Sequence, residues 1–318
     1  MNAVLVFVDH PGTGLTPPLR EMLTAARIAG DPVALVAGSP DPQLLAELGE
    51  YGVSRVLVSE QAELAEYSVT PKAELVAAAA RAVGAVGVLL ENTPEGKDIA
   101  GRSAVLLDAA VISDAVAVDA GLAAEKSVLA GTYAVRAAAV NTPVVISMKP
   151  NSVEAHPLEA PLSAQAEPFE TEFSAAARGA RIVKRREQAV TGRLALGSAR
   201  IVVAGGRGVD GDFRPIEALA DALGGAVGAS RVATDSGWID HSAQVGQTGS
   251  TISPQLYVSA GISGAIQQKA GMQTAKVIVA VNQDPDAPVF EIADFGIVGD
   301  LFQVLPQAVE ELKRRQQG

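Results

Sequence analysis

Residues 199–208 read ARIVVAGGRG, an apolar run that leads directly into a glycine-rich turn. A continuous run of this kind is typical of a strand buried on both faces of a parallel sheet. A helical pattern follows over 213–223, and further apolar runs over 256–259 and 276–281 predict two more strands. The second half of the chain is therefore expected to form a parallel sheet covered by helices.

The first half of the chain repeats this alternation of apolar runs and helical stretches. Strands are expected over 4–8, 33–37, 53–58 and 86–90, and helices over 17–29, 42–50, 71–83 and 94–107. Four shorter apolar segments, separated by turn residues, follow at 113–118, 127–130, 134–138 and 144–148. We expect these four segments to be antiparallel additions. The first half thus predicts a Rossmann-like α/β domain with antiparallel additions.

The length of the chain favours two domains, because 318 residues exceed one typical hydrophobic core. The segment between residues 151 and 197 is rich in Pro, Glu, Ala and Arg, and we place the boundary within it. One α/β domain is expected over 1–190 and a second over 191–318.

Composition excludes several classes of function. A net charge of −11 argues against a nucleic-acid surface. The chain has no cysteine, which excludes disulfides, cysteine-ligated iron–sulfur clusters and thiolate nucleophiles. Its three histidines, His10, His156 and His241, are widely spaced, so no metal site is expected. Redox chemistry would have to come from a bound organic cofactor, and no catalytic residue is predicted.

The N-terminus is expected to be a first strand rather than a targeting signal. Residues 1–12, MNAVLVFVDHPG, lack a basic region and contain only a short apolar run. Elsewhere no uninterrupted apolar stretch approaches the roughly 18 residues that a membrane-spanning helix needs. A cytoplasmic location without a membrane span is the expectation.

Four segments of the second half carry the residue types of a nucleotide site. They are GGRG at 205–208, QVGQTG at 244–249, GISGAIQQ at 261–268 and NQDPDAP at 282–288. Ligands bind at the carboxyl ends of strands in open sheets, and glycines let backbone amides approach a phosphate. Ser263 could bind a ligand or only cap a helix, and Asp284 and Asp286 are expected to form a turn rather than a metal site. Each segment alone is compatible with a plain turn or surface loop, and the set does not choose between NAD, FAD and ATP.

Taken in order, these motifs resemble the C-terminal domain of electron transfer flavoprotein alpha subunits. The resemblance covers roughly residues 199–314 and includes VVAGGRG, VGASR, QVGQTG, YVSAGISGAIQ and VAVNQDPDAPVFEIADFGIVGDLFQVLP. An ordered set of motifs is far more specific than a single glycine motif. The first half is similar in length and pattern, with a looser match.

The resemblance implies that residues 191–318 are an FAD-binding domain that holds one non-covalent FAD. The implied FAD-facing positions are Arg207, Ser230, Arg231, Val245, Gly246, Gln247, Thr248, Ser263, Gly264, Ala265, Ile266, Gln267, Gln268, Asn282, Asp300 and Leu301. Arg231 would stabilise the negative charge of a reduced flavin, and Thr248 would bond the flavin N5 edge. Asn282 and Asp300 would bind hydroxyl groups of the cofactor.

The family also implies partners. A beta subunit would contact the domain over 1–190, complete a heterodimer and hold an AMP. Acyl-CoA dehydrogenases would donate electrons, as in fatty acid beta-oxidation, and a quinone oxidoreductase or similar acceptor would receive them. In members of the family that perform flavin-based electron bifurcation, a second FAD replaces that AMP. The sequence of this chain does not decide between the two types, because that site lies on the beta subunit.

Gln268 departs from the family pattern, because many members have His at this position. A glutamine can donate a hydrogen bond but cannot become cationic near neutral pH. We therefore expect a less positive semiquinone couple for the bound flavin than a His variant would show.

Two other functions remain open at this point. An NAD-dependent oxidoreductase would need a substrate pocket with a base, for which His241 is the nearest histidine, although a surface position is expected for it. A non-redox nucleotide-binding interaction module would use the first half of the chain, where Pro11–Gly14 is a short turn rather than a convincing phosphate loop. A yellow flavin spectrum distinguishes the electron carrier from both.

Overall fold

The computed structural model describes residues 2–9, 12, 14–129, 131–185 and 195–316. The chain divides into two compact units. The first comprises Met1–Ser127 and Ala134–Glu187, and the second comprises Val128–Tyr133 and Gln188–Gly318. The boundary predicted between residues 190 and 191 lies outside the described residues.

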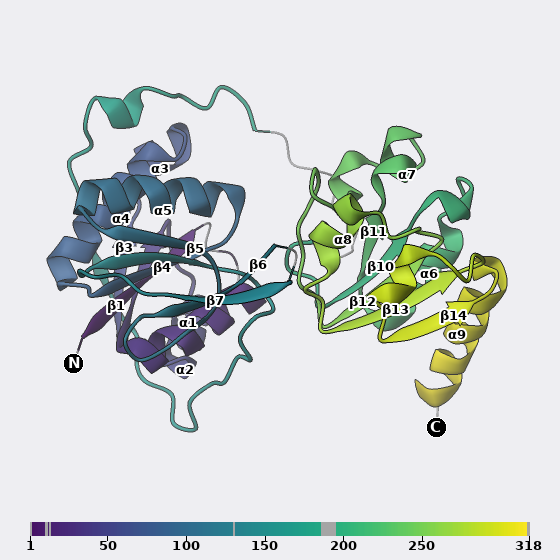
Figure 1. The fold of residues 1–318 in the computed structure, drawn as a ribbon. Helices are drawn as coiled ribbons and strands as arrows, with labels where there is room; N and C mark the ends of the chain where they lie inside the picture. The colour runs from purple at the N-terminus through teal and green to yellow at the C-terminus, as the bar shows by residue number, and fades with distance from the viewer. Residues whose placement is uncertain (1, 10–11, 13, 130, 186–194, 317–318) are drawn as a thin grey trace. The chain divides into compact units, whose positions relative to one another are not determined.

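A nine-stranded sheet forms the centre of the first unit (Figure 1), with the order β7-β6-β5-β8-β4-β1-β2-β3-β9. Its strands are β1 (Ala3–Asp9), β2 (Asp31–Ala37), β3 (Arg55–Ser59), β4 (Gly87–Glu91), β5 (Ala110–Val118), β6 (Ala124–Val128), β7 (Tyr133–Ala137), β8 (Val144–Met148) and β9 (Gln165–Pro168). β1 pairs in parallel with both β2 and β4. This arrangement confirms the expected Rossmann-like α/β domain.

Helices cover both faces of this sheet. They are α1 (Pro17–Ala29), α2 (Pro42–Glu50), α3 (Glu63–Glu66), α4 (Thr70–Val83), α5 (Pro94–Leu107) and the short 3₁₀ turn η1 (Ala176–Arg178). Val4, Val6 and Val8 of β1 belong to the hydrophobic core that includes α1 and α2. Leu5 and Phe7 belong to the core that includes α4 and α5. Because neighbouring side chains of a strand point to opposite faces, the continuous apolar run of β1 supplies both layers.

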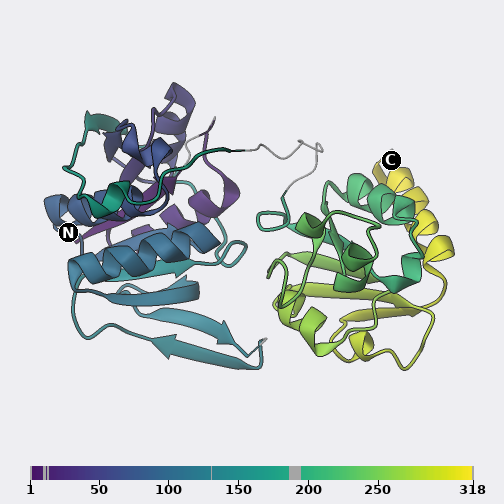
Figure 2. The same ribbon diagram turned by 90° about the horizontal axis from the view of Figure 1, so that it is seen from above.

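The prediction for residues 144–148 is wrong. They form β8, which lies inside the sheet and pairs in parallel with both β4 and β5. All five residues of β8 are buried, as expected for a strand with neighbours on both edges and helices on both faces. The antiparallel part begins where β5 pairs with β6, and it forms one edge of the sheet (Figure 2).

The second unit contains a five-stranded sheet with the order β11-β10-β12-β13-β14, all of whose pairs are parallel. The strands are β10 (Ile201–Gly205), β11 (Ala226–Ala229), β12 (Leu256–Ala260), β13 (Val277–Asn282) and β14 (Phe295–Val298). The helices are α6 (Arg214–Leu223), α7 (Arg231–Asp235), α8 (Ile266–Met272) and α9 (Leu301–Gln316), with 3₁₀ turns η2 (Arg207–Val209), η3 (His241–Ala243) and η4 (Pro288–Glu291). α6 and α9 share one core with Val203 and Val258, whereas Met272 of α8 packs in another with Tyr257. The expected parallel sheet is therefore confirmed.

Two details of the second unit differ from the predictions. The edge strands β11 and β14 were not expected, because AVGA and FGIV are short and each contains a glycine. From Pro306 the sequence predicts a last helix with this proline in its first turn. Pro306 instead lies inside α9, since the helix already begins at Leu301. A proline there removes one backbone N–H from the helix, which remains continuous in the structure.

Candidate functional site

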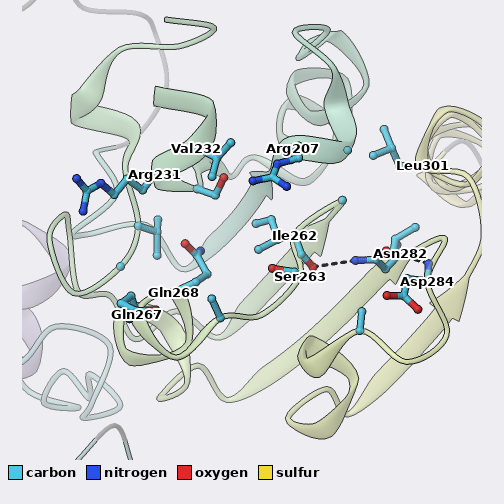
Figure 3. Close-up of a pocket in the computed structure, with 18 of the residues that line it drawn as sticks. Arg207, Arg231, Val232, Ile262, Ser263, Gln267, Gln268, Asn282, Asp284 and Leu301 are labelled. Carbon is cyan, nitrogen blue, oxygen red and sulfur yellow. Dashed lines mark hydrogen bonds between the residues drawn. The ribbon is translucent and has the colours of Figure 1, made fainter. Parts of the chain in front are cut away.

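A cavity of about 730 Å³ opens beside the carboxyl ends of β10, β12 and β13 (Figure 3). Its wall takes residues from all four segments that the sequence singled out, 205–208, 244–249, 261–268 and 282–288. It also takes residues from 230–232, at the start of α7, and from 299–301, before and at the start of α9. The parallel sheet brings these segments together, because parallel strands end at the same edge.

Glycines let the loops of the cavity wall pack backbone against backbone. The N–H of Gly208 donates a hydrogen bond of 2.9 Å to the carbonyl oxygen of Gly261. A Cβ atom on Gly206 would lie 2.4 Å from that same oxygen, and one on Gly271 would lie 2.3 Å from the nitrogen of Gly246. Any larger residue at these positions would push the loops apart, so the glycines are required by close approach.

The wall carries positive charge and an unused polar atom. Arg207 is exposed, and its guanidinium makes no hydrogen bond or ion pair with the described residues. Arg231 forms a 3.2 Å ion pair with Asp235 and points outward at the edge of the cavity (Figure 3). The hydroxyl of Ser230 is buried and has no hydrogen-bond partner among the described residues. A buried polar atom without a partner is rare, and an anionic ligand with oxygen acceptors would satisfy it.

Two buried side chains hold polar groups of the wall in place. Gln244 lies 2.9 Å from the hydroxyl of Thr248 on one side and 2.9 Å from the hydroxyl of Thr234 on the other. The amide nitrogen of Gln268 donates to the phenolic oxygen of Tyr257 at 2.9 Å. Complete burial raises the pKa of Tyr257, so its hydroxyl stays neutral across the physiological range.

The loop after β13 is fixed by its own side chains. Asn282 donates from Nδ2 to the carbonyl oxygen of Ile262 at 2.9 Å and accepts a 3.0 Å hydrogen bond from the N–H of Asp284 (Figure 3). Asp284 in turn accepts from the N–H of Asp286 at 3.0 Å. These bonds confirm the expected Asp-Pro turn. Asn282 therefore connects two loops of the wall.

Most of the sequence-predicted positions line this cavity. They are Arg207, Ser230, Arg231, Val245, Gly246, Gln247, Thr248, Ser263, Ala265, Gln267, Gln268, Asn282 and Leu301. Ser263 does not cap α8, because Ala265 occupies the N-cap position. Its side chain belongs to the wall instead.

Three predicted positions are absent from the lining. Gly264 has φ +84°, and a Cβ there would lie 2.4 Å from the backbone nitrogen of Val289, so it shapes the loop. Ile266 is 77% exposed. Asp300 accepts a 2.9 Å hydrogen bond from the N–H of Phe302 and so caps α9.

The structure adds wall residues that sequence reasoning did not single out. They are Gly208, Val232, Gln244, Gly261, Ile262, Val281, Gln283, Asp284, Ala287 and Gly299. Gly208, Gln244, Gly261, Ile262, Gln283, Asp284 and Ala287 lie within the four motifs, so their place in those motifs was the available signal. Val232 and Gly299 lie next to Arg231 and Asp300, two positions that the resemblance implied, and the folded sheet brings α7 and the turn before α9 to this edge.

The described part of the chain also bears on metal binding, on the position of His241 and on membrane spanning. Among those residues no cluster of His, Cys, Asp and Glu has the arrangement of a metal site. His241 is exposed in η3 and does not line the cavity, which confirms its surface position. None of the described helices combines the length and apolar character needed to cross a membrane.

Comparison with known proteins covers nearly the whole chain. Residues 4–177 match the family model of the electron transfer flavoprotein domain, and residues 195–273 match that of the electron transfer flavoprotein FAD-binding domain. The alpha subunit of the electron transfer flavoprotein of Mycobacterium leprae is 44% identical over 320 residues, covering 99% of each chain. The alpha subunit of Syntrophomonas wolfei is 37% identical, covering 99% of this chain and all of the relative, and that of Paracoccus denitrificans is 39% identical, covering 91% and 93%.

Proposed function

This chain belongs to the family of electron transfer flavoprotein alpha subunits, and from that premise we propose that its second unit holds one FAD without a covalent bond. The observation that carries the proposal is the cavity at the carboxyl ends of β10, β12 and β13. Its volume lies within the range of about 300–1,000 Å³ that is usual for cofactor pockets. The family model of an FAD-binding domain covers most of its wall.

The wall residues fit the diphosphate of such a cofactor. Arg207 offers a guanidinium that no described residue engages, and Ser230 offers a buried hydroxyl without a partner. An anion would supply both with acceptor oxygens. The close packing of Gly208 against Gly261 keeps side chains out of this part of the wall. We propose that these residues hold the diphosphate.

The remaining wall residues fit a ring system with polar edges. FAD supplies the redox chemistry by taking up and releasing electrons. Arg231, Thr248 and Gln268 would lie around the ring, where a positive charge and hydrogen-bond donors favour its reduced, anionic form. Asn282 lines the wall and keeps one amide proton for a cofactor hydroxyl. Asp300, as the cap of α9, would act on the cofactor from just outside the wall.

A second subunit is the partner that the name of the relatives implies. We propose a heterodimer with an electron transfer flavoprotein beta subunit that holds an AMP. Exposed apolar side chains support a covered surface on both units. In the first unit they include Val111 and Val135, and on the edge strand β14 of the second unit they include Phe295 and Val298. Exposed apolar side chains on a sheet edge are typical of protein contacts.

The resemblance also supports a proposal for the route of the electrons. Acyl-CoA dehydrogenases and related enzymes of beta-oxidation would be the donors, and a quinone oxidoreductase or a similar carrier the acceptor, in the cytoplasm. The chain would carry electrons without a substrate of its own. The cavity wall agrees with this role, since it has no histidine or cysteine that would serve as acid, base or nucleophile.

Co-expression with the neighbouring beta subunit tests the proposal. We expect a yellow complex with a flavin absorption band and one FAD for each alpha chain beyond any flavin held by the beta subunit. Extraction with acid should release the FAD intact, because no covalent bond holds it. A colourless complex that binds NAD or ATP instead would reject the proposal, and a stoichiometry of two FAD per heterodimer would indicate the bifurcating type.

A further inference from the structure

A chain of three hydrogen-bonding side chains leads from α7 to the cavity. Thr234 and Gln244 are buried, with 3% and 6% of their surfaces exposed. The hydroxyl of Thr234 lies 2.9 Å from Oε1 of Gln244, and Nε2 of Gln244 lies 2.9 Å from the hydroxyl of Thr248. Thr248 is exposed and lines the cavity. The hydroxyl of Thr248 is therefore oriented by the buried side chain of Gln244.

Thr234 has one hydroxyl proton and two acceptors within reach. Besides Oε1 of Gln244, the carbonyl oxygen of Arg231 lies 2.9 Å from its Oγ1. A threonine hydroxyl donates one hydrogen bond, so the two acceptors compete. The competition makes two hydrogen-bonding patterns possible, which differ in the hydroxyl protons and in an exchange of the amide oxygen and nitrogen of Gln244.

In the first pattern Thr234 donates to Gln244, and Gln244 donates to Thr248. The proton of Thr248 then points into the cavity. In the second pattern Thr234 donates to the carbonyl of Arg231, and the amide of Gln244 turns by half a revolution. Gln244 then donates to Thr234 and accepts from Thr248, whose lone pair faces the cavity. The second pattern contains one more hydrogen bond, because it also satisfies the carbonyl of Arg231.

We propose that Gln244 is a positioning residue that lets Thr248 present either a proton or a lone pair to the ring bound in the cavity. This inference rests on the proposed FAD site. An oxidised flavin offers a lone pair at its central ring nitrogen, and a reduced flavin offers an N–H there. Both forms find a partner in Thr248, and the additional hydrogen bond of the second pattern favours the reduced form. Gln244 therefore raises the reduction potential of the flavin through Thr248.

A double-mutant cycle on the FAD-loaded heterodimer tests this relay. The variants are Gln244→Met, Thr248→Val and the double variant that combines them. Gln244→Met is also combined with Thr248→Ser, because serine keeps the hydroxyl. Gln303→Met is the matched control, because Gln303 is exposed on α9 away from the cavity. The readouts are the midpoint potential of the flavin from a redox titration and its visible spectrum.

We expect Gln244→Met to lower the ratio of reduced to oxidised flavin at a fixed potential about tenfold, or by about 30 mV for a two-electron couple. Gln244→Met should lower the midpoint potential by the same amount when Thr248 is replaced by Ser. When Thr248 is replaced by Val, Gln244→Met should change the potential very little. Should Gln244→Met fail to fold, Thr234→Val breaks the far end of the relay and is read in the same way, with a smaller shift.

The relay would be overturned if Gln244→Met lowered the midpoint potential equally in the wild type and in Thr248→Val. It would also be overturned if Gln244→Met left the wild-type potential unchanged or raised it. In both cases the FAD site itself would stand, because the wild type and Gln303→Met would still be yellow. A wild-type heterodimer that takes up no FAD would overturn the relay and the proposed function together.

Discussion

The amide nitrogen of Gln268, in the cavity wall, donates a 2.9 Å hydrogen bond to the phenolic oxygen of Tyr257, which has no exposed surface. This bond connects the site directly to the core of the second unit, where Tyr257 packs among the apolar residues beneath the sheet. The orientation of the Gln268 amide is thus set by a residue that does not line the cavity.

Tyr257→Phe should lower the stability of the chain modestly. It removes the buried hydroxyl while keeping the ring, so we expect a loss of about 1 kcal/mol in the free energy of unfolding. Urea denaturation measures this loss at the unfolding transition of the second unit. Tyr133→Phe is the control, because Tyr133 is exposed. An unchanged midpoint for Tyr257→Phe would show that the hydrogen bond contributes nothing.

Gln268→His should raise the reduction potential of the bound flavin. A protonated imidazole beside the ring would stabilise its reduced, anionic form by about 1.4 kcal/mol, which corresponds to about 30 mV for a two-electron couple. The difference from the wild type should grow below about pH 6.5, where histidine is charged, and shrink above it. Redox titrations at several pH values check this, and a difference that does not vary with pH would contradict it.

Arg207→Gln should weaken FAD binding. The guanidinium has no partner among the described residues, and we propose that it pairs with the diphosphate. Loss of such a charge-assisted bond costs about 1.5–3 kcal/mol, or roughly 10- to 150-fold in the dissociation constant. The dissociation constant is measured by ultrafiltration, which separates free flavin from bound flavin. Arg214→Gln is the control, because Arg214 is exposed, pairs with Asp212 and lies outside the cavity wall. Equal affinity of the two variants would remove Arg207 from the site.

Gly264→Ala should destabilise the second unit by about 1–3 kcal/mol. Gly264 has φ +84°, and its Cβ would lie 2.4 Å from the backbone nitrogen of Val289. The loop before α8 would have to move, and FAD uptake should fall with it. Gly224→Ala is a matched control, since Gly224 also has positive φ but nothing within 4 Å of its Cβ position. Similar losses for the two variants would show that backbone conformation, rather than contact with Val289, determines the cost.

Lys72→Met should destabilise the first unit. Nζ of Lys72 lies 2.9 Å from Asp9 and 2.7 Å from Glu95, and the side chain is only 3% exposed. Removal of the cation leaves the carboxylates of Asp9 and Glu95 without the ammonium group that both of them contact. We expect this to cost about 3 kcal/mol in the free energy of unfolding. Thermal unfolding measures the loss. The exposed Lys97→Met is the control, because Lys97 pairs with Asp114 while 43% of its side chain is exposed. A loss no larger than that of Lys97→Met would contradict the prediction.

Sequence reasoning succeeded where a residue's local pattern reports its surroundings. The apolar run of β1 and the stretch 199–208 both predicted buried parallel strands, and the four motifs after the strands do converge on one cavity. It failed for β8, which follows antiparallel strands in the chain but returns to the interior of the sheet. Strand order depends on which neighbours bury an apolar segment, and five apolar residues look the same in either position.

The two α/β units, the family and many positions of the cavity wall can be inferred from the amino-acid sequence, because glycine turns and buried strands leave a local signature in the residues themselves. The folded structure was needed to show that Asp300 caps a helix, that Gly264 shapes a loop, and that Gln244 and Tyr257 hold polar groups of the wall. The bonds from Tyr257 and Thr234 join residues 10 or 11 positions apart in the chain. Such bonds form when folding brings loops and core together, and no local pattern encodes them.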